Sequence, residues 1–278
     1  MDNFDLHNHS RFSDGLLSPS QLIDLAARNA TDAVALTDHD TTDGLEEADR
    51  AARAAGIVLV PGVEISVSWG GTTLHVVGLQ VDPTHEELAR GLESIRAGRL
   101  GRGEQIAAEL ERLGFPGTLQ GALDLAENKE MISRSHFARY LAQQGHVKDT
   151  QAAFDKYLGK GKPAYVAHRW ASLDNAVAWI RGAGGIAVMA HPGRYNLKPM
   201  FRDEMLEDFR AAGGEAIEVV TGSHRPEEYA HWQRIALEHG FLASRGADYH
   251  GPGESPHEPG RLEPLHASLT PVWSRWAH

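Results

Sequence analysis

Short apolar runs alternate with longer stretches of helical periodicity along most of this chain. The runs that predict strands lie at residues 5–9, 33–36, 57–60, 63–68, 73–79, 186–190, 216–220 and 242–245. The stretches that predict helices lie at residues 18–26, 44–55, 172–183, 199–212 and 226–240. Strands and helices in alternation predict a mainly parallel sheet, which is either a closed barrel or an open doubly wound sheet.

Local signals fix several of these boundaries. Ser18 and Pro19 are favoured at the cap and the first position of a helix. Gly70 and Gly71 stand between two β-prone runs and predict a tight hairpin. We expect Pro61 and the glycine after it to separate the strands at residues 57–60 and 63–68.

Histidines and acidic residues recur where the predicted strands end. His7 and His9 lie two positions apart in a strand, so their side chains share a face and can hold one ion together. Candidate metal ligands across the chain are His7, His9, Asp14, His39, Glu64, His75, His191, Asp248 and His250. Because only a closed barrel gathers so many strand ends around one point, they favour the barrel and predict a multinuclear metal site.

The stretch from residue 83 to residue 163 interrupts the alternation with helical periodicity and almost no β-branched runs. We therefore predict a barrel domain of residues 1–82 and 164–278, with a helical insertion of residues 83–163 that caps the barrel mouth. The chain of 278 residues is long enough, since one α/β barrel takes about 250. Arg96, Arg99 and Arg102 in this stretch fit a solvated helix face.

Charge and cysteine content narrow the function. The chain has 38 acidic and 27 basic residues, a formal net charge of −11, which argues against binding long duplex DNA through a general surface field. It has no cysteine, so a metal must bind nitrogen and oxygen atoms, which suits Mn²⁺, Fe²⁺ or Zn²⁺. The sequence offers neither a signal peptide nor a segment long enough to cross a membrane. We expect a cytoplasmic protein without a membrane partner.

The chain resembles the PHP (polymerase and histidinol phosphatase) family of phosphoesterases in short strings between residues 5 and 250. These strings are His7-Asn8-His9, Ser13-Asp14-Gly15, Thr37-Asp38-His39-Asp40, Gly62-Val63-Glu64, His75, Ala190-His191-Pro192 and Asp248-Tyr249-His250. The resemblance implies a distorted (β/α)₇ TIM-like barrel with three divalent ions, for which we expect Mn²⁺, with Fe²⁺ or Zn²⁺ as alternatives.

By position, the resemblance also implies which residues hold which ion. The first ion is held by His7, His9, Glu64 and Asp248, the second by Glu64, His75 and His191, and the third by Asp14, His39 and His250. Glu64 then bridges two ions, and we expect a hydroxide shared by them to attack the phosphorus. The predicted catalytic residues are Glu64, Asp14, His191 and His224. For His224, protonation of the leaving group, contact with phosphate and a plain loop position all remain open.

Two further strings resemble a subgroup of the family that carries a helical insertion. They are Ser133-Arg134-Ser135-His136-Phe137-Ala138 and Thr221-Gly222-Ser223-His224. That subgroup removes the 3′-phosphate of nucleoside 3′,5′-bisphosphates, and some members trim short RNA from its 5′ end. The resemblance thus implies a small phosphorylated nucleotide or a short RNA 5′ end as substrate. Ala247 departs from the family, which often has serine there, but leaves the neighbouring ligands in place.

Three basic residues are candidates for contacts with substrate phosphate. Arg134 and His136 open a predicted helix, where free backbone N–H groups and a cation together favour an anion. Arg194 follows a candidate ligand at the barrel mouth and can hold phosphate with two N–H groups. Glu218 lies within a strand run and fits packing, a salt bridge or the site equally.

Other functions use similar residues. Amidohydrolase barrels also begin with a His-x-His strand, but the extra Asp14, His39 and His250 and the accompanying arginines favour phosphate substrates. Among phosphoesterases, a 5′-3′ exonuclease on short RNA and a histidinol phosphatase could use identical ligands. A non-catalytic metal-binding module is a further alternative, against which the complete third ligand set argues.

Overall fold

A single sheet forms the framework of the computed structural model, which describes residues 3–276. Within that range its seven strands are β1 (Phe4–Asp5), β2 (Ala33–Leu36), β3 (Val58–Trp69), β4 (Thr72–Leu79), β5 (Ile186–Met189), β6 (Ala216–Thr221) and β7 (Leu242–Gly246). Neighbours in the sheet follow chain order, and the pairs are parallel except β3–β4 and β4–β5. The sheet is therefore mainly parallel with one antiparallel strand, β4, in its middle.

The sheet closes between its first and last strands. Leu6 N donates to Arg245 O at 2.9 Å, and His9 N donates to Tyr249 O at the same distance. Asn8 also forms a parallel bridge to Tyr249. The predicted distorted barrel is confirmed, and it explains how residues from both ends of the chain reach one site.

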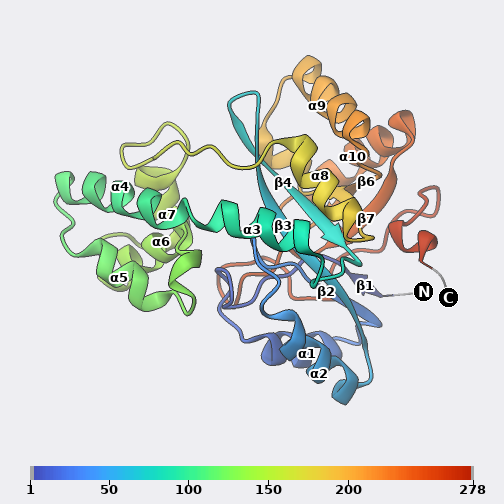
Figure 1. Cartoon of the computed structure of the whole chain (residues 1–278), viewed down its shortest axis with the longest axis horizontal. Helices are drawn as coiled ribbons and strands as arrows, with labels where there is room; N and C mark the ends of the chain where they lie inside the picture. The colour runs from blue at the N-terminus through green and yellow to red at the C-terminus, as the bar shows by residue number, and fades with distance from the viewer. Residues whose placement is uncertain (1–2, 277–278) are drawn as a thin grey trace.

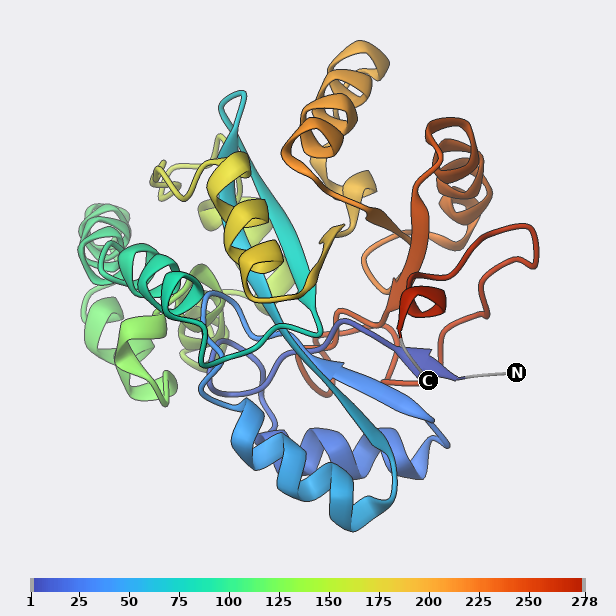
Figure 2. The ribbon, with the colours of Figure 1, turned by 45° about the vertical axis from the view of Figure 1, so that its right-hand side comes forward.

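Helices surround the barrel and form a lobe beside it (Figures 1 and 2). Those around the barrel are α1 (Pro19–Arg28), α2 (Leu45–Ala55), α3 (Glu86–Arg96), α8 (Leu173–Gly182), α9 (Pro199–Ala212) and α10 (Pro226–His239). Those of the lobe are α4 (Arg99–Arg112), α5 (Thr118–Leu125), α6 (Arg134–Gln143), α7 (Thr150–Ala153) and the π-helix η2 (Phe154–Leu158). Short 3₁₀ turns are η1 (Lys129–Met131), η3 (Pro192–Tyr195) and η4 (Val272–Arg275). None of the helices in residues 3–276 combines the length and apolar character that crossing a bilayer requires.

Several local predictions hold and two do not. Ser18 caps α1, and Gly70 and Gly71 form the β3–β4 turn with φ angles of 51° and 72°. The expected break at Pro61 is wrong, because β3 runs through it without interruption. Its first part pairs with β2 and the part from Gly62 onward pairs with β4, so the proline marks a change of partner. The strand predicted at residues 5–9 is also shorter than expected, with regular pairing only at Phe4–Asp5.

The alternation of side chains along the strands places polar residues inside the barrel mouth. In β4, Val77 and Leu79 belong to the apolar cluster inside the barrel, and His75 continues the same face. In β3, Ile65 packs outward against the helices, so Glu64 points inward. Apolar residues thus fill one end of the barrel and potential ligands fill the other.

The lobe has its own apolar core, which contains Ile106, Leu110, Phe137 and Leu141. By contrast, the apolar side chains of α3 belong to the same cluster as the barrel helices. A Cβ at Gly91 of α3 would lie 2.5 Å from the Trp179 ring, so α3 packs closely on α8. The domain boundaries at residues 83 and 163 stay a prediction. The apolar core of the lobe begins in α4, one helix after the predicted boundary at residue 83.

Candidate metal centre

The structure brings the nine predicted ligands together at the barrel mouth. Within residues 3–276 they form overlapping groups whose ligand atoms lie within 4.8 Å of one another. These groups are His9, Asp14, His39 and His250; His7, His191 and Asp248; His7, His9 and Glu64; and His39, Glu64 and His75. They arise from loops and strands spread over the whole barrel, so the site depends on closure of the sheet.

Glu64 lies at the centre of the cluster and is fully buried. Each of its two carboxylate oxygens faces more than one imidazole. The distances are 2.9 Å to His75 Nδ1, 3.0 Å to His191 Nε2 and 3.4 Å to His7 Nε2 from Oε1, and 2.9 Å to His39 Nδ1 and 3.3 Å to His9 Nε2 from Oε2. A carboxylate surrounded in this way has the position that a bridging ligand needs.

The nitrogen and oxygen atoms of the cluster are better arranged to coordinate metal ions than to form hydrogen bonds with one another. Glu64 Oε2 and His39 Nδ1 lie 2.9 Å apart, yet neither has a hydrogen bond within residues 3–276. Asp14 Oδ1 and Asp248 Oδ1 are likewise buried without a hydrogen-bond partner. Buried polar atoms are normally paired, so unpaired lone pairs that converge on common points indicate cation ligands. The cluster is therefore capable of holding metal ions through nitrogen and oxygen atoms.

Ionisation in the cluster supports this interpretation. Burial lowers the pKa of His9 to about 3, and the charges of His250 and His39 act in the same direction. This keeps His9 neutral, which is the form that binds a metal. Burial opposes the charge on Glu64, but nearby histidines hold the pKa of that carboxyl well below its usual range. Despite burial, nearby carboxylates raise the pKa of His7, His39 and His250, so an ion that binds these rings must displace their protons.

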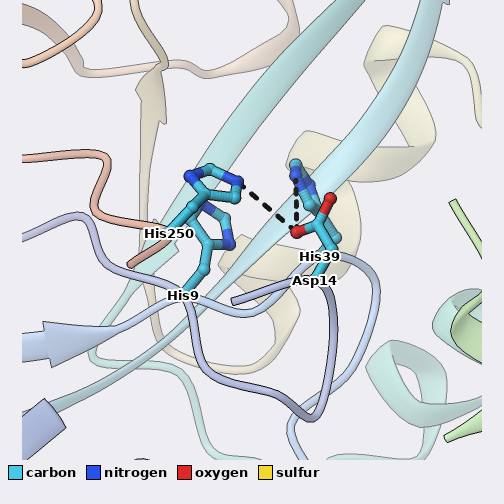
Figure 3. Close-up of side chains that lie close together, drawn as sticks. All are labelled: His9, Asp14, His39 and His250. Atoms are coloured by element: carbon cyan, nitrogen blue, oxygen red, sulfur yellow. Dashed lines mark ion pairs between the residues drawn. The ribbon is translucent and has the colours of Figure 1, made fainter. Parts of the chain in front are cut away.

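Asp14 connects the cluster to the lobe. Its Oδ1 faces His250 Nε2 at 3.4 Å and His39 Nε2 at 3.7 Å (Figure 3). Its Oδ2 accepts hydrogen bonds from Ser135 Oγ at 2.8 Å and Ser133 Oγ at 3.1 Å, both at the start of α6. One oxygen is thus anchored by the lobe while the other stays available to an ion.

Glu218 of β6 is a residue whose position sequence reasoning left open. Its Oε1 lies 2.7 Å from His7 Nδ1, and its Oε2 accepts a hydrogen bond from His191 N at 2.7 Å. A carboxylate on the far nitrogen of a ligating histidine fixes the orientation of the ring. The signal was a glutamate amid the apolar residues of a buried strand, since such a charge must have a partner.

A cavity of about 350 Å³ opens beside the cluster. Barrel and lobe both contribute to its walls, and it is lined by Asp14, His39, His75, Asp248 and His250 together with Arg99, Arg102, Arg134 and Arg194. The expectation that Arg99 and Arg102 lie on a solvated helix face is wrong. Arg99 is only 5% exposed, and both side chains line this cavity from the first turn of their helix.

The predicted phosphate contacts divide into two kinds. Arg134 and Arg194 line the cavity, and Arg194 Nη1 lies 3.3 Å from Asp248 Oδ2. His136 is buried beneath the start of α6, where its Nδ1 accepts a hydrogen bond from Ser133 N at 3.1 Å. This contact caps the helix, so the geometry favours a structural role for His136 over a phosphate contact.

His224 is also held by backbone groups. Its Nε2 accepts a hydrogen bond from Gly193 N at 2.9 Å, and its Nδ1 lies 3.4 Å from Val219 O. Its ring stacks on Trp232 with centroids 5.5 Å apart. Since both ring nitrogens are engaged, this geometry argues against the predicted catalytic role and indicates that His224 positions the turn after His191.

A closed α/β barrel with a buried histidine and carboxylate cluster at its mouth defines the class of this protein. The chain belongs to the PHP domain family, whose model matches residues 5–159. A 3′,5′-nucleoside bisphosphate phosphatase of Chromobacterium violaceum is 51% identical over 98% of this chain and 96% of its own length. A 5′-3′ exoribonuclease of Haemophilus influenzae is 40% identical over 98% of both chains.

A solved structure supports the same fold. It is described as an amidohydrolase from Chromobacterium violaceum with bound sulfate and no metal. It is 51% identical, covers 98% of this chain and 95% of its own, and superposes with a TM-score of 0.95. The predicted family is confirmed, and the shared fold extends over 98% of the chain.

Proposed function

We propose that the protein is a metal-dependent phosphoesterase that removes the 3′-phosphate of nucleoside 3′,5′-bisphosphates. The observation that carries the proposal is a metal-ligand cluster that opens into a cavity lined by arginines. Such a cavity suits a substrate with more than one phosphate. The name of the relative from Chromobacterium violaceum supports this substrate class, and the sulfate bound in the solved structure supports an affinity for tetrahedral anions.

The cofactor part of the proposal is three divalent ions, with Mn²⁺ favoured over Fe²⁺ or Zn²⁺. In this proposal the first two ions share Glu64, and the third is held by Asp14, His39 and His250. When bound, such ions supply a nucleophile at neutral pH and neutralise charge on phosphate oxygens.

The chain's own residues orient and stabilise the reacting groups. Glu64 lies at the centre of the cluster. His191 and Asp14 belong to different ligand groups on either side of it. Arg194 is anchored at the cavity wall by Asp248 and Ser223, at 3.3 and 3.4 Å. Its remaining N–H groups can donate to the phosphate that is hydrolysed. Burial in the cluster excludes bulk water, which strengthens these charged contacts.

A second candidate function is 5′-3′ exonucleolytic cleavage of short RNA. The relative from Haemophilus influenzae, which covers nearly the whole chain, favours it. The same ligands could act on a phosphodiester if an RNA 5′ end entered the cavity. The cytoplasmic location also stays a prediction, which cell fractionation would test.

A hydrolysis screen with metal analysis tests the proposal. Purified protein is loaded with Mn²⁺, Fe²⁺ or Zn²⁺ and its metal content is measured. Phosphate release is followed from nucleoside 3′,5′-bisphosphates, nucleoside monophosphates and histidinol phosphate, nucleotide release from short RNA, and amine release from an amide substrate. We expect the highest kcat/KM with bisphosphates. A loaded enzyme that releases no phosphate from bisphosphates would overturn the proposal.

Variants separate chemistry from folding in this screen. We expect Glu64→Gln to lose turnover and metal content while the fold persists, because it removes a central charge and no apolar packing. Glu46 is 86% exposed on α2, so Glu46→Gln is the matched control and should behave as the wild type. Full activity with the wild-type metal count in Glu64→Gln would contradict the bridging assignment.

A further inference from the structure

Two arginines of the lobe face the cavity without a carboxylate partner. Arg102 extends from α4 and Arg134 from the first position of α6. In the part of the chain that the structure describes, neither side chain takes part in an ion pair, and each is oriented by a backbone carbonyl instead. Arg102 Nε donates to Val166 O at 3.1 Å, and Arg134 Nη1 donates to Leu158 O at 3.2 Å. These bonds hold the guanidinium groups in place without neutralising them.

Aromatic rings support both guanidinium groups. Arg102 Cζ lies 5.1 Å from the centroid of Trp170, and Arg134 Cζ lies 5.6 Å from Phe154 and 5.8 Å from Tyr165. A planar cation that stacks on a ring keeps its N–H groups free in its own plane. Stacking therefore fixes the orientation of the two arginines and leaves donors for an anion.

Arg99, a buried arginine of the same helix, has its charge neutralised by a carboxylate. It also lies over Trp170, at 4.9 Å, but it forms an ion pair with the buried Asp40 and a further bond to Ser66. Arg102, three residues later, has no such partner. The comparison indicates that the charge of Arg102 is kept for a ligand.

The unpaired charges carry an energetic cost. Burial, together with the neighbouring charges of Arg134 and Arg99, lowers the pKa of Arg102 to about 9. The guanidinium nevertheless stays protonated at neutral pH. Two like charges in a partly buried wall destabilise the protein unless an anion neutralises them.

Contacts place Arg134 nearer the ligand cluster than Arg102. Arg134 stands between Ser133 and Ser135, which both donate to the ligand Asp14. Arg102 instead bonds to Val166 O and lies against Trp170. A molecule with two anionic groups could place one at the cluster and the other at the pair.

We propose that Arg102 and Arg134 form a second anion site, which binds the phosphate group that is not hydrolysed. The ligand class is a phosphate monoester dianion, held by charged hydrogen bonds from two guanidinium groups. The proposal rests on the proposed function and deepens it, since the pair selects substrates that carry a second terminal phosphate. Binding at the pair positions the other phosphate at the cluster, so binding energy is used for orientation.

Substrate pairs test the site through kcat/KM. Arg102→Met removes the charge but keeps an unbranched stem against Trp170. We expect kcat/KM for a nucleoside 3′,5′-bisphosphate to fall by about tenfold or more, while kcat/KM for the 3′-monophosphate stays within about twofold. Arg112 is on the same helix with its side chain 70% exposed, so Arg112→Met is the control and should match the wild type on both substrates. If Arg102→Met lowers kcat/KM equally for both substrates, or for neither, the proposed anion site is wrong.

A binding measurement without turnover distinguishes failure of the site from failure of the proposed function. Inorganic sulfate should raise the Tm of the wild type and of Arg112→Met in a concentration-dependent way, and less so in Arg102→Met. Equal sulfate effects in all three proteins would overturn the anion site even if bisphosphates are hydrolysed. A reduced effect in Arg102→Met, in a protein that hydrolyses no bisphosphate, would support the site and reject the proposed substrate.

Discussion

Ser135 donates a hydrogen bond from its Oγ to Oδ2 of Asp14 at 2.8 Å, which ties the start of α6 to a predicted metal ligand. Ser133 makes a second bond to the same oxygen, and Arg139 of α6 donates both to the backbone oxygen of Asp14 and to Glu254. The lobe therefore does more than cover the cavity. It fixes a loop that contributes a ligand, so docking of the lobe and metal binding should stabilise each other.

The first prediction follows from this contact. We expect Ser133→Ala combined with Ser135→Ala to weaken binding of the ion at Asp14 by about tenfold or more, because the carboxylate loses the groups that orient it. Metal content after dialysis against limiting Mn²⁺ measures the effect. Ser274 bonds only to a nearby carbonyl on an exposed turn, so Ser274→Ala is the control. An unchanged metal titration in the double variant would show that the two serines serve only the helix cap.

Glu218 leads to the second prediction. We expect Glu218→Gln to weaken metal binding by about 10- to 100-fold, because an amide cannot accept from both the His7 ring and the His191 backbone. Isothermal titration with Mn²⁺ and the metal count of the purified variant measure it. Metal binding at the wild-type level, with only a lower Tm, would assign Glu218 to folding alone.

Metal removal leads to the third prediction. Three buried carboxylates, those of Asp14, Glu64 and Asp248, lie close together in the cluster. Bound ions stabilise the native state by about 2.7 kcal/mol for each site at a free concentration 100 times its Kd. Chelation should therefore lower the Tm and abolish turnover, and added Mn²⁺ should restore both. An identical Tm with and without chelator would contradict a resident metal cluster.

The sequence was sufficient for the barrel and for the residues that gather in the cluster, because both depend on local alternation and on strand ends. Glu64 and His75 could be chosen because they lie in β-prone runs and match the strings that resemble the family. Partners across the fold could not be placed in this way. Glu218 pairs with His7, which is 211 residues away in the sequence, and a local sequence pattern cannot predict a contact between such distant residues.

The residues whose surroundings the sequence did not show share a physical cause. Arg102 looked like a surface arginine because nothing in a helical pattern reveals which face another domain covers. His136 and His224 were chosen for their chemistry, but their backbone partners, Ser133 and Gly193, became visible only in three dimensions. Pro61 was expected to end a strand, yet a strand can exchange partners where a proline lacks its N–H.

His224 leads to the last prediction, which separates a structural from a catalytic role. Burial lowers the pKa of His224 from 6.5 to about 4. Between these values the unfolded chain binds a proton that the folded protein does not, so stability is complete above pH 6.5 and falls as the pH drops toward 4. The slope is about 1.4 kcal/mol per pH unit for one histidine, or about 2 kcal/mol by pH 5.

Urea unfolding at pH 7 and pH 5 measures this loss. A glutamine oxygen can accept the Gly193 N–H bond but does not titrate, so His224→Gln should lose about 2 kcal/mol less than the wild type between the two pH values. It should also keep a kcat close to the wild-type value at pH 7. His266 is exposed, and His266→Gln controls for the loss of an imidazole. If His224→Gln shows the wild-type pH dependence of stability but a kcat lowered by orders of magnitude, His224 acts in the reaction and its hydrogen bonds to the backbone rearrange when substrate binds.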